Sequence, residues 1–162
     1  MKLLKEIEET IQETIDMMNE PSGHGPAFTH SLGYRRGLEW AQEKIKENTE
    51  QRPWGNFEVL YDGEDCKVKR ITVNPEQRLS YQFHNKRTEQ WTIISGQGMV
   101  TIDDKKNTAK RGTVIWIPQE AKHRIKNTSK EEDLVFIETQ LGTYFGEDDI
   151  TRIEDDYERI KD

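Results

Sequence analysis

The sequence predicts a mainly β domain, folded as a sandwich or barrel, that follows a helical N-terminal segment. From Arg52 onward, short runs rich in β-branched and aromatic residues alternate with turn signals such as Asp62-Gly63 and Asp103-Asp104. Short strands at close spacing are typical of a sandwich or barrel and not of a parallel sheet. We expect eight strands, at residues 56–61, 66–73, 79–85, 90–95, 98–103, 113–117, 123–126 and 134–140.

The first 50 residues have a helical pattern instead. Apolar side chains recur there every three or four positions, as on one face of a helix, at Leu4, Ile7, Ile11, Ile15 and Met18. Residues 21–26 contain prolines and glycines that break a helix, and a second helix is expected at about residues 31–47. We therefore expect a helical hairpin appendage at residues 1–50. A β domain follows at residues 51–162 and ends in an acidic C-terminal arm.

Composition and charge restrict the class of partner. The formal net charge is -7, which disfavours nucleic acid as a partner. Residues 51–145 are less acidic, with 15 Lys and Arg against 13 Asp and Glu, which favours an anionic ligand there. No apolar run approaches the length of a membrane span, and the N-terminus has no signal-peptide pattern. The single cysteine, Cys66, fits a reducing compartment, so we expect a soluble cytoplasmic protein.

A candidate metal site lies on two of the predicted strands and the turn between them. Gln82 and His84 are two residues apart, so their side chains project from the same face of a strand. Glu89 follows a short polar turn and can fold back toward them, and His123 is the fourth candidate ligand. Amide, imidazole and carboxylate groups that converge can bind a divalent metal. A Gln-x-His pair alone is more often a surface or core feature, but the pattern around this pair favours the metal site.

Three separated blocks of sequence resemble one family of cupins. In order they are Arg52-Pro-Trp-Gly55, the Gln-x-His and Arg-x-Glu-x-Trp pattern of residues 82–91, and the Gly-Glu-Asp-Asp-Ile sequence of residues 146–150. The family is the type II phosphomannose isomerase domain, also found at the C-terminus of bifunctional mannose-1-phosphate guanylyltransferases. Over residues 52–159 the resemblance implies a cupin fold, which is a double-stranded β-helix or jelly-roll barrel.

The resemblance also implies one divalent metal ion, held by Gln82, His84, Glu89 and His123. Sites with two nitrogen and two oxygen ligands accept Zn, Mn, Co, Ni or Fe, and we expect zinc first. The implied function is a metal-dependent aldose–ketose isomerase that interconverts mannose 6-phosphate and fructose 6-phosphate. This reaction moves a proton between C1 and C2 of the sugar, which needs a base and a group that stabilises the oxyanion.

Several further residues are candidates for this chemistry. Arg87 matches an arginine associated with isomerase activity, and it could hold the phosphate or stabilise the oxyanion. Glu138 shares a strand face with Phe136, so its carboxylate can point inward and is a candidate for the proton-transfer base. Other cations could bind the substrate phosphate: Lys67, Lys69, Arg70, Lys86 and Arg124.

The chain departs from the family pattern beside the predicted ligands. The family tends to have consecutive histidines where Asn85 and Lys86 stand here, and a histidine at the position of Gln90. These changes leave two alternatives open, a non-catalytic sugar-binding cupin and another metal-dependent cupin enzyme such as an oxygenase. The amide of Gln82 disfavours the oxygenase. The expected partner is a small sugar phosphate, and a homodimer is a further expectation because cupins often pair through their sheets.

Overall fold

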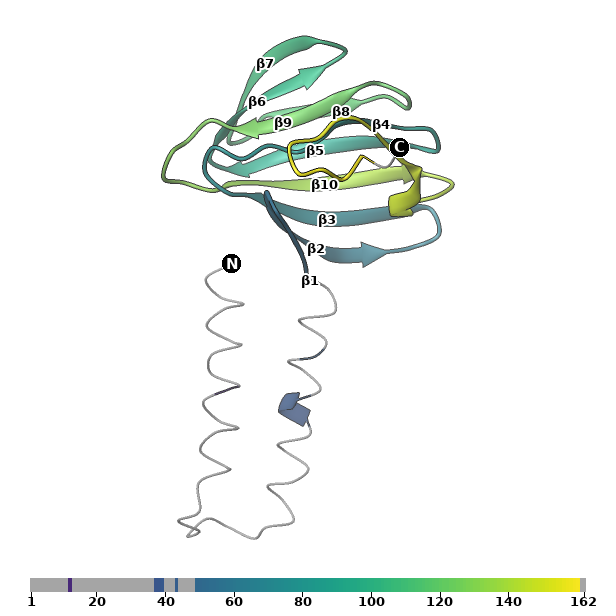
Figure 1. The fold of residues 1–162 in the computed structure, drawn as a ribbon. Coiled ribbons are helices and arrows are strands. Elements are labelled where there is room, and N and C mark those ends of the chain that lie inside the picture. The colour runs from purple at the N-terminus through teal and green to yellow at the C-terminus, as the bar shows by residue number, and fades with distance from the viewer. Residues whose placement is uncertain (1–11, 13–36, 40–42, 44–48, 161–162) are drawn as a thin grey trace, which may run out of the picture. The chain divides into compact units, whose positions relative to one another are not determined.

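The computed structural model describes residues 12, 37–39, 43 and 49–160 (Figure 1). The chain divides into two compact units, Met1–Asn48 and Thr49–Asp162. Residues 12, 37–39 and 43 are helical, and the rest of the predicted hairpin lies outside the described residues. None of the helical residues described belongs to a helix long and apolar enough to cross a membrane.

Residues 49–160 form two antiparallel sheets, which confirms the predicted mainly β class. The larger sheet has the strand order β1-β2-β3-β10-β5-β8, with bounds Thr49–Arg52, Gly55–Asp62, Cys66–Val73, Leu134–Gly142, Arg87–Ser95 and Val114–Ile117. The smaller sheet has the order β11-β4-β9-β6-β7, with bounds Ile150–Glu154, Tyr81–His84, His123–Asn127, Gln97–Ile102 and Lys105–Lys110. A short 3-10 helix, η1 (Glu147–Asp149), precedes β11.

All eight predicted strands are present, and three further strands escaped prediction. β1 begins at Thr49, two residues before the predicted domain boundary. β7 has the polar sequence KKNTAK and buries Ala109 alone, so it lacks the alternation that marks a half-buried strand. β11 lies in the segment expected to be an acidic arm. Each of these strands is at the edge of its sheet, where one side needs no partner and polar residues are tolerated.

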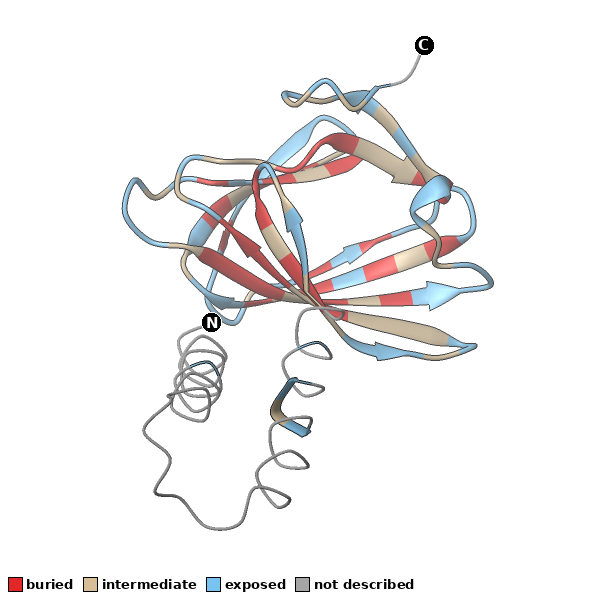
Figure 2. Cartoon of the chain, turned by 60° about the horizontal axis from the view of Figure 1, so that its bottom comes forward, coloured by how far each residue is buried: buried red, intermediate tan, exposed pale blue. Residues whose placement is uncertain are grey.

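The core lies between the two sheets. Figure 2 shows buried residues alternating with exposed ones along the strands, as expected for side chains that point alternately inward and outward. Trp91 on β5 is fully buried at the centre, and its ring centroid lies 4.9 Å from that of Phe136 on β10. From the opposite sheet, Val100 and Ile125 belong to the same apolar cluster. These contacts fix the two inner faces on which the polar site is built.

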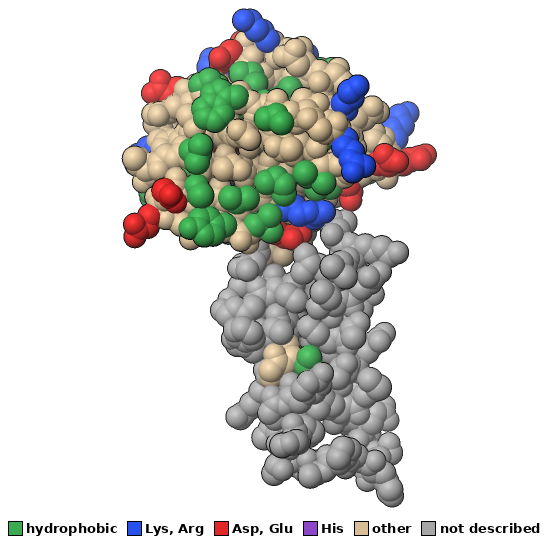
Figure 3. Space-filling view, turned by 180° about the vertical axis from the view of Figure 1, so that it is seen from behind, with side chains coloured by type: hydrophobic (Ala, Val, Ile, Leu, Met, Phe, Trp, Pro, Cys, Tyr) green, Lys and Arg blue, Asp and Glu red, His purple; other side chains and the backbone are tan. Residues whose placement is uncertain are grey.

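The outer face of the larger sheet carries exposed apolar side chains. Figure 3 shows hydrophobic side chains gathered on one face of the barrel. Exposed residues of this type include Ile94, Val114, Trp116 and Leu141, from β5, β8 and β10. A surface of this kind is compatible with pairing of two copies. The expected homodimer stays a prediction.

The C-terminal segment is built into the smaller sheet, because β11 pairs with β4. Asp149, at the end of η1, is 7% exposed and accepts hydrogen bonds from the backbone N–H groups of Asn85 (3.3 Å) and Lys86 (3.1 Å). Its Oδ2 also lies 3.8 Å from Nη1 of Arg87. The segment expected to be an acidic C-terminal arm is therefore attached to the smaller sheet by strand pairing. It closes the turn that separates His84 from Arg87.

Replacing Asp149 by alanine is expected to lower the free energy of unfolding by about 2–4 kcal/mol. Two backbone N–H groups lose their acceptor and the buried Arg87 loses an acidic neighbour. Denaturant unfolding measures this change. Asp148→Ala is the matched control, because exposed Asp148 accepts a hydrogen bond from the Tyr144 hydroxyl and its loss should cost much less than that of Asp149. Equal costs for the two variants would contradict the role of Asp149.

Candidate metal centre

Three potential metal ligands converge from both sheets. Glu89 projects inward from β5, His84 from β4 and His123 from β9, and their ligand atoms all lie within 4.8 Å of one another. Oε1 of Glu89 is 3.0 Å from Nε2 of His84, and its Oε2 is 3.4 Å from Nε2 of His123. All three side chains are almost completely buried. The structure thus brings together three of the four predicted ligands.

The histidine rings are oriented as metal ligands would be. Nδ1 of His123 donates a hydrogen bond to the carbonyl oxygen of Ala121 at 2.8 Å, which fixes the tautomer and leaves the Nε2 lone pair free to bind a metal. This Nε2 atom and Nδ1 of His84 are buried without a hydrogen-bond partner among residues 49–160. Buried polar atoms without partners are uncommon in stable proteins. The orphaned Nε2 atom beside a carboxylate fits a metal ion.

Gln82 lies next to this cluster. It is directly opposite His123 in the pairing of β4 with β9, so the two side chains share the inner face. Nε2 of Gln82 is 3.5 Å from Nε2 of His84, and its Oε1 accepts a hydrogen bond from the Ser80 hydroxyl at 2.6 Å. A half-turn of the amide would present Oε1 to the cluster. Gln82 therefore lies beside the three converging residues, and its role as the fourth ligand stays a prediction.

The cluster perturbs the protonation of its members. Burial acts to raise the pKa of Glu89, but the neighbouring imidazoles of His123 and His84 outweigh it and hold the pKa well below the usual range. Burial lowers the pKa of His84. For His123 burial also acts to lower the pKa, but the adjacent carboxylate of Glu89 prevails and raises it. The site is therefore built around an ionised carboxylate, which is the form that binds a cation.

Arg87 is buried beside this carboxylate and is not a solvated turn residue. Its side chain is 2% exposed, and its Nε donates a hydrogen bond to Oε1 of Glu89 at 3.2 Å. Nη1 donates to the carbonyl oxygen of Gly146 at 3.2 Å, and Nη2 lies 3.5 Å from Nε2 of His84. The guanidinium group is held at the ligand cluster. This position suits stabilisation of negative charge beside the candidate metal ligands.

Glu138 points inward from β10, as its strand face predicts. Its Oε2 accepts a hydrogen bond from Nε1 of Trp91 at 3.0 Å, and its Oε1 accepts one from Nε2 of Gln140 at 2.7 Å. The same Trp91 N–H donates to Glu89 at 3.1 Å. Burial, and then the charge of Glu89, raises the pKa of Glu138 to about 7. A carboxyl with this pKa can accept and return a proton at neutral pH.

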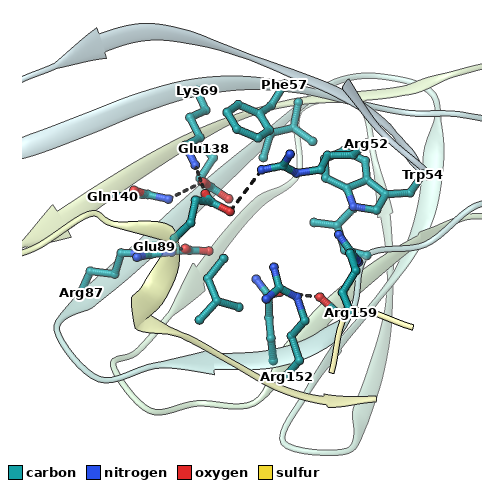
Figure 4. Close-up of a pocket in the computed structure, with 16 residues that line it drawn as sticks. Arg52, Trp54, Phe57, Lys69, Arg87, Glu89, Glu138, Gln140, Arg152 and Arg159 are labelled. Atoms are coloured by element: carbon teal, nitrogen blue, oxygen red, sulfur yellow. Dashed lines mark hydrogen bonds and ion pairs between the residues drawn. The ribbon is translucent and has the colours of Figure 1, made fainter. Parts of the chain in front are cut away.

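A pocket opens onto these residues. Figure 4 shows Glu89, Glu138 and Gln140 on one side of it and Arg152 and Arg159 on the other. Gln82 also lines it. The cationic side chains of its lining are Arg52, Lys69, Arg87, Arg152 and Arg159, against three acidic ones, Glu89, Glu138 and Glu147. The pocket therefore combines the candidate metal centre with a positively charged wall.

The structure brings one of the five predicted phosphate-binding cations to this pocket. Lys69 lines it, directly opposite Glu138 in the pairing of β3 with β10. The other four residues do not line it and have other neighbours: Lys67 pairs with Asp62, Arg70 with Glu58 and Arg124 with Glu154, and Lys86 lies over the ring of Tyr144. Alternation along β3 puts Lys67 and Lys69 on the same face as buried Ile71, so it favours these two residues over Arg70.

Arg52, Arg152, Arg159 and Glu147 line the pocket but were not predicted as site residues. They come from β1, η1, β11 and the segment after it, which have weak alternation or none. The sequence feature that could have indicated these residues is their position within or near the first and last blocks of the family resemblance.

The departures from the family pattern lie outside the pocket. Asn85 and Lys86 are exposed in the turn between β4 and β5. Gln90 is exposed on β5, between the inward-pointing Glu89 and Trp91, so its side chain faces the opposite side of the sheet. The interpretation that these changes lie against the ligands is therefore wrong, although they are adjacent in sequence.

Comparison with known proteins agrees with the fold and the site. Residues 40–155 match the family model of the mannose-6-phosphate isomerase C-terminal domain. The chain belongs to this family. The cupin domain of Schizosaccharomyces pombe Cnp3 superposes with a TM-score of 0.54 at 19% identity, covering 59% of this chain and 68% of that one. The predicted cupin fold is confirmed.

The sequence of this chain is similar to part of two larger proteins. The chain is 44% identical over 108 residues to the alginate biosynthesis protein AlgA of Pseudomonas aeruginosa. It is 40% identical over 109 residues to the mannose-1-phosphate guanylyltransferase ManC of Salmonella typhimurium. Each match covers 67% of this chain and 22% of the relative, so the chain corresponds to about a fifth of these proteins.

Purified protein is expected to carry about one divalent transition metal ion per chain. The His123→Ala variant should lose this ion, because a site with three protein ligands binds a metal much more weakly than a site with four. Elemental analysis after dialysis against metal-free buffer measures the occupancy. Gln90→Ala is the control, since Gln90 is exposed on the outer face of β5 and should leave occupancy unchanged. Equal metal content in wild type and His123→Ala would refute the site.

Proposed function

We propose that the chain is a metal-dependent aldose–ketose isomerase that interconverts mannose 6-phosphate and fructose 6-phosphate. The observation that carries this proposal is the convergence of Gln82, Glu89, Arg87 and Glu138 on one pocket. Together they supply metal ligands, a cation for the oxyanion and a carboxyl suited to proton transfer. Membership of the mannose-6-phosphate isomerase C-terminal family supports the choice of reaction.

The metal would be held by Gln82, His84, Glu89 and His123. Zinc is the first choice, and Mn, Co, Ni or Fe would fit the same two nitrogen and two oxygen donors. One carboxylate among the four ligands leaves a formal charge of about +1, so a bound divalent ion can act as a Lewis acid toward the oxygen atoms of the substrate. The buried setting strengthens that electrostatic effect, because little water competes for the charges.

Arg87 acts in this scheme on the oxyanion and not on the phosphate. Its guanidinium is fixed by Glu89 and by the carbonyl oxygen of Gly146, and it is too deeply buried to reach a group at the pocket entrance. A preorganised cation beside the reacting carbons stabilises the negative charge that develops when the proton leaves. The phosphate must then be held by other cations of the lining.

Glu138 is the proposed base that moves the proton between C1 and C2. Its pKa of about 7 leaves a substantial fraction ionised at neutral pH and makes the protonated form accessible for return of the proton. Hydrogen bonds from Trp91 and Gln140 hold its two oxygen atoms in place.

We place the reaction in the cytoplasm, which the single cysteine, Cys66, favours.

The direct test is a coupled assay that detects fructose 6-phosphate formed from mannose 6-phosphate. Activity is expected in the metal-loaded protein, with loss on chelation and recovery when a divalent ion is added back. A non-catalytic sugar-binding cupin would bind mannose 6-phosphate in calorimetry without turnover. Metal-loaded protein that binds the sugar phosphate but forms no product would reject the isomerase proposal.

Glu138→Gln is expected to retain the metal but to lower kcat by about 100-fold or more, because general base catalysis contributes about 10²–10⁴. In the wild type, kcat should fall as the pH drops through about 7, since protonation of Glu138 removes the base. Steady-state kinetics measured from about pH 5.5 to about pH 8.5 check both effects. If kcat in Glu138→Gln stays within about tenfold of wild type, another group is the base.

A further inference from the structure

Most cations of the pocket wall are already neutralised by neighbouring carboxylates. Nε of Arg159 donates to both oxygen atoms of Asp155, at 3.2 and 3.1 Å. Lys69 donates to Oε1 of Glu147 at 3.0 Å, and Arg52 lies 3.5 Å from Oε2 of the same carboxylate. Arg52 also forms an ion pair with Glu50, so Lys69 and Arg52 each have a carboxylate partner.

Arg152 differs from these residues. Its Nε atom is buried, and among residues 49–160 it has no hydrogen-bond partner. Within the same residues Arg152 forms no ion pair, because the nearby Glu147 and Asp155 are engaged by the cations above. Burial and the charge of Arg159 lower the pKa of Arg152, as expected for a cation short of acidic partners. A buried guanidinium N–H without an acceptor is costly and points to a missing anion.

The position of Arg152 relates it to the metal centre. In the pairing of β11 with β4, Arg152 is directly opposite Gln82, and Ile150 is opposite His84. Gln82 is in turn opposite His123 on β9. Arg152, Gln82 and His123 therefore form one row across three neighbouring strands. Side chains in such a row share a face and are close neighbours. A ligand bound at the metal centre would extend along this row toward Arg152.

We propose that Arg152, with Arg52 and Lys69, forms the subsite that binds the phosphate monoester of the substrate. A phosphate monoester carries a charge between -1.5 and -2 at about pH 7. The guanidinium of Arg152, which forms no ion pair among residues 49–160, can meet this charge with Arg52 and Lys69 on the same pocket wall. A guanidinium group can donate two parallel hydrogen bonds to phosphate oxygens, so it supplies orientation as well as charge. In a hexose 6-phosphate the phosphate and the C1–C2 end are at opposite ends of the molecule. The row from His123 to Arg152 separates the reacting end from the phosphate end.

This subsite rests on the proposed function for the identity of the sugar, but its test needs no turnover. Calorimetry measures binding of mannose 6-phosphate, inorganic phosphate and unphosphorylated mannose to metal-loaded protein. Arg152→Ala is expected to weaken binding of mannose 6-phosphate and inorganic phosphate about 10- to 100-fold, because a charge-assisted pair of hydrogen bonds is lost. Binding of mannose should stay within about twofold of wild type, because the sugar end does not contact Arg152.

Two further variants keep the test decisive. Arg152→Lys retains the charge without the planar fork, so an intermediate loss is expected for the two phosphates alone. Lys126→Ala removes an exposed cation from β9 and should change none of the three affinities by more than about twofold. Metal content and melting temperature are measured in every variant. If Arg152→Ala does not fold, Arg152→Lys decides by the same selectivity.

The outcomes separate this inference from the proposed function. Unchanged binding of mannose 6-phosphate in the Arg152 variants, or an equal loss for mannose, would overturn the phosphate subsite. The same conclusion follows if the wild type binds mannose 6-phosphate no more tightly than mannose. A selective loss of phosphate binding in a protein that shows no isomerisation would support the subsite and reject the isomerase.

Discussion

The buried carboxylate of Glu89 is the group on which the arrangement of the site depends. An ionised carboxylate can be buried only when hydrogen bonds and opposite charges replace its water. Glu89 obtains these from Arg87 and Trp91 on its own strand and from His84 and His123 on the facing sheet. The same contacts therefore satisfy the carboxylate and hold the inner faces of the two sheets in register at this end of the barrel.

Trp91 links this polar cluster to the apolar core. Its ring packs on Phe136, and its single N–H is shared between Glu89 and Glu138. Buried charge pairs contribute little net stability, because desolvation offsets most of their attraction. The apolar residues between the sheets must therefore supply most of the folding energy, through burial of about 25 cal/mol per Å². The polar cluster lies where the core ends, and it adds little to the stability that the core supplies.

The sequence could predict those parts of the fold and site that depend on strand periodicity. Gln82 and His84 share a face because they are two residues apart, and Glu138 points inward for the same reason. Such reasoning cannot find β7 or β11, because these edge strands are too polar to alternate. It also cannot find Arg152, whose role depends on pairing with a strand about 70 residues earlier, at Gln82. The pairing of strands far apart in the sequence is determined by the whole fold, and the local sequence pattern holds little information about it.

Alternation also explains why the departures from the family pattern need not change the chemistry. Gln90 lies between two inward-pointing residues, so a change there alters the outer face of the sheet. Asn85 and Lys86 contribute to the site through their backbone N–H groups, which Asp149 binds whatever side chains they carry. Neighbours in sequence can thus be remote from a site in space, whereas Arg152, far away in sequence, lies beside it. Whether a cupin of this family keeps its activity should be judged from the inward-facing residues.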